Sequence, residues 1–345
     1  LNILTMSNST EHLSSDCRSP SLVAFHIVLL YLLFFMFPIA LLLNGIAGWV
    51  SLHLDSTSTF IVYLKNLVAA DLLITLMIPL KAASMLPGAT VEFRAFICHY
   101  AGVSFYCSSY TNIVLMGLIS LDHFFKIVRL RGKVLGQNMK FSVIMSTLVW
   151  ILLFGGTAIP NIFLTDQVPA TQTDDLCTSL KPPAGKNFHK YVVLFMEILF
   201  WCVNILIVFC YICITMKVLQ SFRNSGSNNR RGKKKTKLQK IKLRVFLVII
   251  VFFVAFGPYH IVRIPYTFQQ VNYASNSCLF ELSKFAKDAS LWLATTNTCI
   301  DPLLYVFLCR EFKEKLVSLM ADVAISLKLA SAPDKPDTTL QQTKF

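Results

Sequence analysis

The stretch from Val23 to Val50 reads VAFHIVLLYLLFFMFPIALLLNGIAGWV and contains no Asp, Glu, Lys or Arg. An α-helix needs about 20 consecutive apolar residues to cross the hydrocarbon core of a bilayer, because it rises by about 1.5 Å per residue. This stretch is long enough and contains no charge that would have to be buried in lipid. It is therefore predicted to be a membrane-spanning helix.

Six more apolar stretches follow the first, at about 59–85, 96–127, 141–164, 189–217, 243–270 and 283–308. Only 14% of the whole chain is charged, whereas soluble domains usually carry about 25%. The stretches are unbroken, and a transmembrane barrel would instead show ten-residue segments of alternating polarity. The predicted fold is an all-α membrane protein, a seven-transmembrane helix bundle with a short amphipathic helix after the last span.

Basic residues set the predicted orientation, because they are enriched in cytoplasmic links. The stretch 217–244 holds eleven Lys or Arg and no acid, and the links after the third and seventh spans are also basic. All three then lie inside, in a multi-pass protein of the plasma membrane with an extracellular N-terminus. The glycosylation sequence that begins at Asn8 agrees with this side. Attraction to anionic lipid also explains the basic run. Nucleic-acid binding is not expected, because no soluble domain with interleaved aromatic residues accompanies the run.

The chain is accordingly divided into four parts. Residues 1–22 form an extracellular N-terminus, and residues 23–308 form the seven-span domain. Residues 309–322 form a juxtamembrane cytoplasmic helix, and residues 323–345 form a disordered cytoplasmic tail. The first 20 residues contain no apolar core of signal-peptide length, so the first span is expected to direct insertion.

Four cysteines, Cys17, Cys98, Cys177 and Cys278, fall on the extracellular side, where disulfides persist. Four cysteines allow three pairings, and of these we favour Cys98–Cys177 with Cys17–Cys278. Cys309 follows the last span on the cytoplasmic side, which makes it a hypothetical palmitoylation site.

Several polar side chains lie deep within the spans, where they are expected to face the interior of the bundle. An ionisable group such as Asp71 costs about 2.5–3.5 kcal/mol to insert at mid-span. Two interpretations fit: a hydrogen-bond network between helices, which composition alone favours, and oxygen ligands for a sodium ion at Asp71. The group comprises Asn44, Asp71, Asn112, Asn297 and Asp301.

Basic and aromatic residues also gather at the outer ends of spans six and seven, against the orientation rule. His260, Arg263 and Tyr266 are spaced three apart, which predicts one helix face, and Lys287 opens span seven. Any one of them could simply extend a long side chain to the membrane surface. Together with Lys181 and His189, they favour a pocket for a phosphate-bearing anion.

Residues 23–322 resemble the rhodopsin-like G-protein-coupled receptors. The residues that carry this resemblance are Asn44, Asp71, Cys98, Trp150, Pro258 and Asp301-Pro302-Leu303-Leu304-Tyr305. More narrowly, the chain is similar to the purinergic nucleotide receptors, in the branch that contains the platelet ADP receptor. Four stretches carry that similarity: FIVYLKN at 60–66, PNIFLT at 160–165, PYHIVRIPYT at 258–267 and KDASLWL at 287–293.

The resemblance implies a receptor for extracellular ADP that activates an inhibitory G protein, with no cofactor and with homo- or heterodimers as an option. The implied ligand site comprises Tyr106, Tyr110, Asn161, Lys181, His189, His260, Arg263, Tyr266, Gln270 and Lys287. The implied activation network adds Tyr305 to the deep polar group. The implied G-protein-facing residues are Asp122, His123, Phe124 and Tyr211.

Two departures from the family pattern bear on function. The family usually carries Asp-Arg-Tyr at the inner end of span three, where this chain has Asp122-His123-Phe124. Histidine is shorter than arginine and often neutral near pH 7. The substitution is therefore expected to affect how the resting receptor is held inactive and how strongly it couples to a G protein. In span five, Val193 and Met196 replace more polar pocket residues of close relatives, which bears on adenine recognition.

Other functions remain as alternatives. A UDP-sugar is the alternative agonist, and a weakly coupled receptor that only binds nucleotide is the alternative prompted by His123. A transporter would show internal repeats or paired helix breaks near mid-membrane, and the sequence shows neither. The intramembrane acids, among them Glu197 and Asp288, come with no nucleophile or metal-ligand pattern, so we predict that the chain is not an enzyme.

Overall fold

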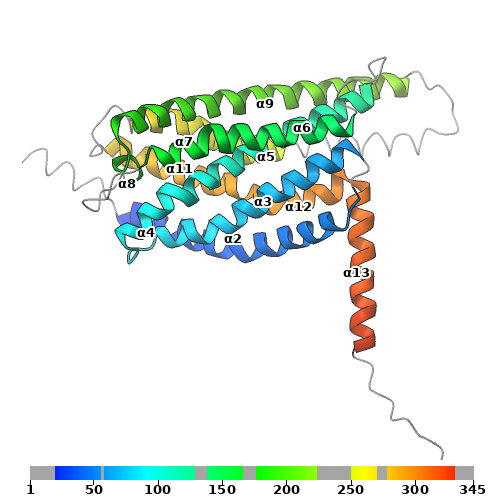
Figure 1. Cartoon of the computed structure of the whole chain (residues 1–345), viewed down its shortest axis with the longest axis horizontal. Helices are drawn as coiled ribbons and strands as arrows, with labels where there is room; N and C mark the ends of the chain where they lie inside the picture. Colours follow the sequence, from blue (N-terminus) through cyan, green and yellow to red (C-terminus); the bar gives the residue numbers. More distant parts are fainter. Residues whose placement is uncertain are drawn as a thin grey trace, which may run out of the picture.

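The computed structural model describes residues 20–55, 58–128, 138–165, 176–223, 250–269 and 278–330, and the regular elements in these ranges are all helical. Figure 1 shows long helices lying side by side in one bundle, with α13 (Arg310–Ala330) crosswise at one end. The N-terminal end of α2 (Pro20–Leu52) and the short helix α4 (Val91–Phe96) lie at the opposite end. The predicted helical bundle is confirmed.

The second and third crossings follow the predicted stretches closely. α3 spans Thr59–Ser84. The third crossing combines α4, a π-helical turn η1 (Ile97–Ala101) and α5 (Gly102–Val128). It begins at Val91, earlier than the predicted 96, because Thr90 caps α4 by accepting a hydrogen bond from the backbone N–H of Phe93.

The fourth crossing changes its winding along its length. It runs through α6 (Met139–Trp150), a π-helical segment η3 (Ile151–Ala158) and α7 (Ile159–Phe163). Pro160 lacks an N–H and its ring would clash with the preceding turn of a regular α-helix. The wider segment directly before Pro160 is where that clash is relieved.

The fifth crossing is α9 (Pro183–Arg223), preceded by the short α8 (Leu176–Ser179). α9 begins before the predicted 189, because proline is well tolerated in the first turn of a helix. The sixth crossing is described over Ile250–Gln269, so predicted residues 243–249 and Gln270 lie outside the described residues.

The seventh crossing is broken. α11 (Cys278–Thr295) and α12 (Asn297–Leu308) meet at Thr296, whose hydroxyl donates to the carbonyl of Leu293 at 2.6 Å. By length and composition, six described helices can cross a membrane, and residues 279–307 pass only together with the helix that follows, bent from them by 95°. Charged residues near Lys287 and the polar Asn297 and Asp301 make this crossing less apolar than the others.

The prediction of a juxtamembrane helix ending at residue 322 is wrong at its C-terminal end. α13 continues to Ala330, because residues 323–330 read VAISLKLA and contain no helix breaker. Pro333 follows within three residues of the end, where proline commonly stops a helix. The remaining part of the predicted tail lies outside the described residues.

Side chains sort by their surroundings as expected for a bundle in lipid. Large apolar residues such as Phe35, Phe163 and Ile205 are at least 70% exposed, and lipid is the solvent that accepts them. Polar residues such as Asn44 and Asp71 are fully buried. α5 lies against α3 and α9, so it links the polar groups of the bundle from one end to the other.

Close packing of α5 on α9 depends on Gly117, because a Cβ there would lie 2.9 Å from Cγ1 of Val203. We expect Gly117→Ala to lower the free energy of unfolding by about 1–3 kcal/mol through overpacking. Gly45→Ala is the matched control, since a Cβ at Gly45 meets nothing within 4 Å and both variants gain the same helix propensity. Thermal unfolding of detergent-solubilised protein measures the difference, and equal melting temperatures for the two variants would contradict it.

Candidate functional site

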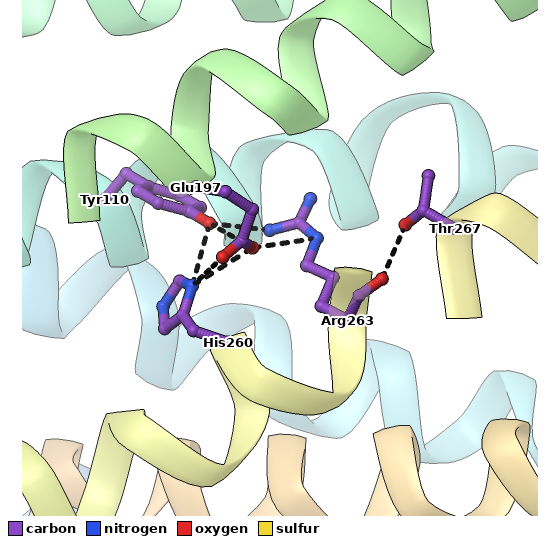
Figure 2. Close-up of polar contacts among 5 residues, drawn as sticks. All are labelled: Tyr110, Glu197, His260, Arg263 and Thr267. Carbon is purple, nitrogen blue, oxygen red and sulfur yellow. Dashed lines mark hydrogen bonds and ion pairs between the residues drawn. The ribbon is translucent and has the colours of Figure 1, made fainter. Parts of the chain in front are cut away.

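Arg263 forms the centre of a buried polar cluster near the α4 end of the bundle, where α5, α9 and the helix Ile250–Gln269 meet (Figure 2). Its side chain is largely enclosed, with a relative exposure of 7%. Its Nη1 donates to the hydroxyl of Tyr110 at 2.7 Å. Its guanidinium carbon lies 5.2, 5.7 and 5.4 Å from the ring centroids of Tyr106, Tyr110 and Tyr259, within the range of cation–π attraction.

Glu197 supplies the negative charge of this cluster from α9 (Figure 2). Its carboxylate lies 3.0 and 3.1 Å from Nδ1 of His260, which therefore carries the proton and donates. The Tyr110 hydroxyl donates weakly to the same carboxylate at 3.5 Å, and Nε of Arg263 lies 3.8 Å away. The His260 ring also stacks on Phe200 with centroids 3.6 Å apart.

A second group of charges lies on α3 and α11, around Tyr106. Nζ of Lys287 pairs with Oδ1 of Asp288 at 3.0 Å and lies 4.5 Å from the ring centroid of Tyr266. Nζ of Lys81 lies 5.2 Å from the ring centroid of Tyr106. Arg263 lies at the same distance from this ring, so two cations, Lys81 and Arg263, lie against Tyr106.

Tyr266 differs from its predicted direction. It was expected to share a face with His260 and Arg263, but its ring lies against Lys287 and stacks on Phe280 at 5.6 Å. A helix turns by about 100° per residue, so six residues bring a side chain about 120° from the starting direction. Tyr266 consequently faces α11, whereas His260 faces α9.

Lys181, in the loop between the fourth and fifth crossings, contacts Asn161 of α7. Nζ of Lys181 donates to Oδ1 of Asn161 and, at 2.7 Å, to the hydroxyl of Thr165. Burial lowers the pKa of Lys181 to about 8. The predicted residues Asn161 and Lys181 are brought together by this contact, and Nδ1 of His189 is buried without a hydrogen-bond partner among the described residues.

A small cavity of about 30 Å³ lies alongside these residues within the bundle. Its lining includes Tyr106, Tyr110, Tyr259 and His260 of the cluster around Arg263 and also Asn112 and Asn297. The rest of the lining is largely apolar. A cavity of this volume has room for about one or two water molecules.

The deep polar network joins the helices as the sequence predicts. Asn112 donates to both Asp71 and Asp301, and Asn297 donates to Asp301 at 2.6 Å. Tyr305 donates to Asp71. Asn44 donates to Thr75 at 3.3 Å and to the carbonyl of Thr298 at 2.8 Å.

Oxygen atoms in this network bear on the predicted sodium ion. Among the described residues, Oδ1 of Asn112, Asn297 and Asp301 are buried without a hydrogen-bond partner. Oxygen donors of this kind suit a hard cation. The part of the chain described contains no group of three His, Cys, Asp or Glu side chains placed to hold a metal, so sodium at Asp71 stays a prediction.

The disulfide between Cys98 and Cys177 is present, with Cα atoms 5.2 Å apart, and confirms that pairing. It ties η1 to α8 beside the site. The other pairing includes Cys17, which, like the predicted glycosylation site Asn8 and the ligand residue Gln270, lies outside the described residues. Cys309 is 2% exposed, and its Sγ lies 3.4 Å from Glu311. Burial also raises the pKa of this thiol to about 11, and palmitoylation of Cys309 stays a prediction.

At the C-terminal end of α5, Asp122 has partners other than an arginine. It accepts from the Thr59 hydroxyl at 2.5 Å and from Nζ of Lys126 at 2.7 Å. The ring of His123 stacks on Phe60 at 5.2 Å, and Phe124 contacts Phe209. Tyr211 is buried, and its hydroxyl hydrogen-bonds the side chain of Ser120.

Sequence reasoning missed four members of the site. Glu197 and Asp288 were noted only as intramembrane acids, and Lys81 and Tyr259 were not singled out. A basic residue near the outer end of a span opposes the orientation rule, and that signal pointed to Lys81 as much as to Lys287. No such local signal identifies the partners of Glu197, because they come from two other helices.

Comparison with known proteins identifies the family of this chain. Residues 44–305 match the model of the 7 transmembrane receptor (rhodopsin family). The Y-type purinoceptor 13 of Homo sapiens is 40% identical over 309 residues, covering 90% of this chain and 84% of the relative. The Y-type purinoceptor 14 of Bos taurus is 37% identical over 303 residues, 87% of each chain.

A third relative extends the comparison. G-protein coupled receptor 87 of Mus musculus is 34% identical over 309 residues, covering 90% of this chain and 82% of the relative. The family model covers most of the chain and includes the helices that build the site. The chain therefore belongs to the rhodopsin family of seven-transmembrane receptors, and within it to the Y-type purinergic G-protein-coupled receptors, which are receptors and not enzymes.

Proposed function

We propose that this receptor binds extracellular ADP at the cluster around Arg263 and activates an inhibitory G protein at the opposite end of the bundle. The orientation follows the basic residues, with the N-terminus and the Cys98–Cys177 disulfide outside. The observation that carries the proposal is the group of cations at two tyrosine rings: Lys81 and Arg263 each lie 5.2 Å from the ring centroid of Tyr106, and Lys287 lies 4.5 Å from that of Tyr266. A nucleoside diphosphate combines the multiple negative charge and the aromatic base that such a site would recognise.

The free energies expected for contacts at this site are of the size that micromolar binding requires. Hydrogen bonds to charged groups contribute about 1.5–3 kcal/mol each. Two or three of them from Arg263 and Lys287, with stacking on Tyr106, approach the roughly 8 kcal/mol of micromolar binding after ordering losses. Among the described residues Asp288 and Glu197 are the counter-ions in contact with these cations.

Signalling follows as a shift between two populations. ADP draws the outer ends of the sixth and seventh crossings together through Arg263 and Lys287. Pro258 provides a flexible point about which the inner half of the sixth helix swings. The ligand must bind the active arrangement more tightly, since otherwise no population changes.

A UDP-sugar is the second candidate ligand, favoured by the α9 side of the site. Val193 and Met196 there are buried and apolar, with relative exposures of 4% and 2%. They offer no hydrogen bond to the amine of adenine. Which nucleotide gives the greater response in the experiment below decides between the two ligands.

The first test removes the cations. Arg263→Ala and Lys287→Ala are each expected to reduce ADP potency at least tenfold, because each removes a charge-assisted contact. G-protein activation in cells challenged with ADP, ATP and a UDP-sugar measures it. Lys186→Ala is the control, since Lys186 is an exposed lysine in the first turns of α9. Unchanged ADP potency in both test variants would contradict the proposed site.

The second test uses pH. Lys181 has a pKa of about 8, so it is mostly charged at pH 7 and mostly neutral at pH 9. ADP affinity is expected to fall severalfold over this range as one cation near the site is lost, while the ligand's own charge is already complete. Ligand binding to membranes measures the change. Lys181→Arg stays charged and should flatten the profile, and an equally steep fall in this variant would exclude Lys181 as the cause.

The third test concerns coupling. His123→Arg is expected to raise the maximal ADP-stimulated G-protein activation severalfold, because arginine is longer and permanently charged. His53→Arg adds the same charge at the same end of the bundle, on an exposed residue, and should not. A response that appears only with His123→Arg would support a nucleotide-binding receptor that couples weakly. Silence of both forms to every nucleotide would exclude the nucleotide-receptor proposal.

A further inference from the structure

Glu197 places a carboxylate beside Arg263, in a site that is proposed to bind an anion. Its side chain has a relative exposure of 3%, and its neighbours on the same face of α9, Val193 and Phe200, are buried and apolar. A buried charge is tolerated only when it is paired and hydrogen-bonded. His260, Tyr110 and Arg263 supply that pairing, so the carboxylate is stable there without any ligand.

Glu197 and Arg263 form an ion pair without a hydrogen bond. Nε lies 3.8 Å from Oε1 of Glu197, which is within ion-pair range but too long for a hydrogen bond. Nη1 is engaged by Tyr110 at 2.7 Å. A guanidinium binds phosphate through two parallel N–H groups, and both of its paired edges include a nitrogen that faces Glu197 or Tyr110.

An anion at either edge of Arg263 therefore enters the field of Glu197. In this low-dielectric interior the two negative groups repel each other strongly. The repulsion grows with the charge of the ligand, whereas the attraction of Arg263 is already partly offset by Glu197. Hydrogen bonds to His260 fix the carboxylate, so it cannot simply turn away.

We propose that Glu197 is a specificity-determining residue, an internal counter-ion that limits how many negative charges the site accepts. A ligand's phosphate has to displace the carboxylate from Arg263, so each added phosphate gains less than it would beside a free arginine. This inference rests on the proposed nucleotide site and deepens it by assigning selectivity among phosphate chain lengths. Tyr110 positions both partners, since its hydroxyl contacts Arg263 and Glu197 together.

The test compares adenosine mono-, di- and triphosphate on wild type and Glu197→Gln. Glutamine keeps the size and hydrogen-bonding capacity of the side chain and removes the charge. Potency should rise for all three ligands, and the gain for the triphosphate should be at least about threefold larger than the gain for the monophosphate. Glu197→Asp keeps the charge and should retain the wild-type ranking.

A second control and a second measurement complete the design. Glu92→Gln removes a charge from an exposed residue at the same end of the bundle and should change nothing. Ligand-induced thermal stabilisation of the detergent-solubilised receptor gives the same comparison for a variant that does not reach the cell surface.

The outcomes separate the two proposals. An equal change for all three ligands in Glu197→Gln, or a graded gain also in Glu197→Asp or Glu92→Gln, would overturn the role of Glu197 while leaving the nucleotide site intact. A wild-type receptor that neither responds to nor is stabilised by any adenine nucleotide would overturn the proposed function and this inference with it.

Discussion

Charge buried within a bilayer must be paired, and the polar interior of this receptor follows from that constraint. Two unit charges about 4 Å apart attract each other by about 4 kcal/mol at an effective dielectric constant of 20. Arg263 and Glu197 lie at such a distance, and Lys287 with Asp288 lies closer. Without these pairs the cations of the outer end would not be stable inside the bundle. Because the pairing is provided by acids and by tyrosine rings, the cations are held in place and stay available to a stronger anion.

α5 connects the buried polar groups along the length of the bundle. Tyr106 and Tyr110 lie in its N-terminal part, Asn112 joins Asp71 to Asp301 in the middle, and Asp122 pairs with Thr59 and Lys126 at the C-terminal end. A change at Arg263 therefore acts on a helix that also holds the proposed coupling residues. The C-terminal end differs from the usual family pattern, since Asp122 has partners without an arginine. The proposed ligand site and the proposed coupling residues therefore lie at different ends of α5, and each is tested by its own experiment.

The fold could be predicted from the sequence almost entirely, because lipid demands long apolar helices and the chain supplies them one after another. The individual residues of the site were predicted where local rules apply, as for His260 and Arg263, which lie three apart on one helix. Tyr266 was misplaced because three-residue spacing drifts around a helix over two steps. The partners of Glu197 were missed because they depend on which helices touch, and residues far apart in the sequence decide that. Lys81 was missed although its position against the orientation rule was a local signal. The end of α13 was set too early because residues 323–345 were assigned to a single polar tail, although residues 323–330 contain no helix breaker.

A structure of the receptor with bound ADP would show whether Arg263 and Lys287 bind the phosphates of a nucleotide. We expect phosphate oxygens within hydrogen-bond distance of both side chains, with the adenine ring against Tyr106 and the Arg263–Glu197 contact opened. A nucleotide bound elsewhere on the bundle, with the Arg263–Glu197 contact unchanged, would contradict this expectation.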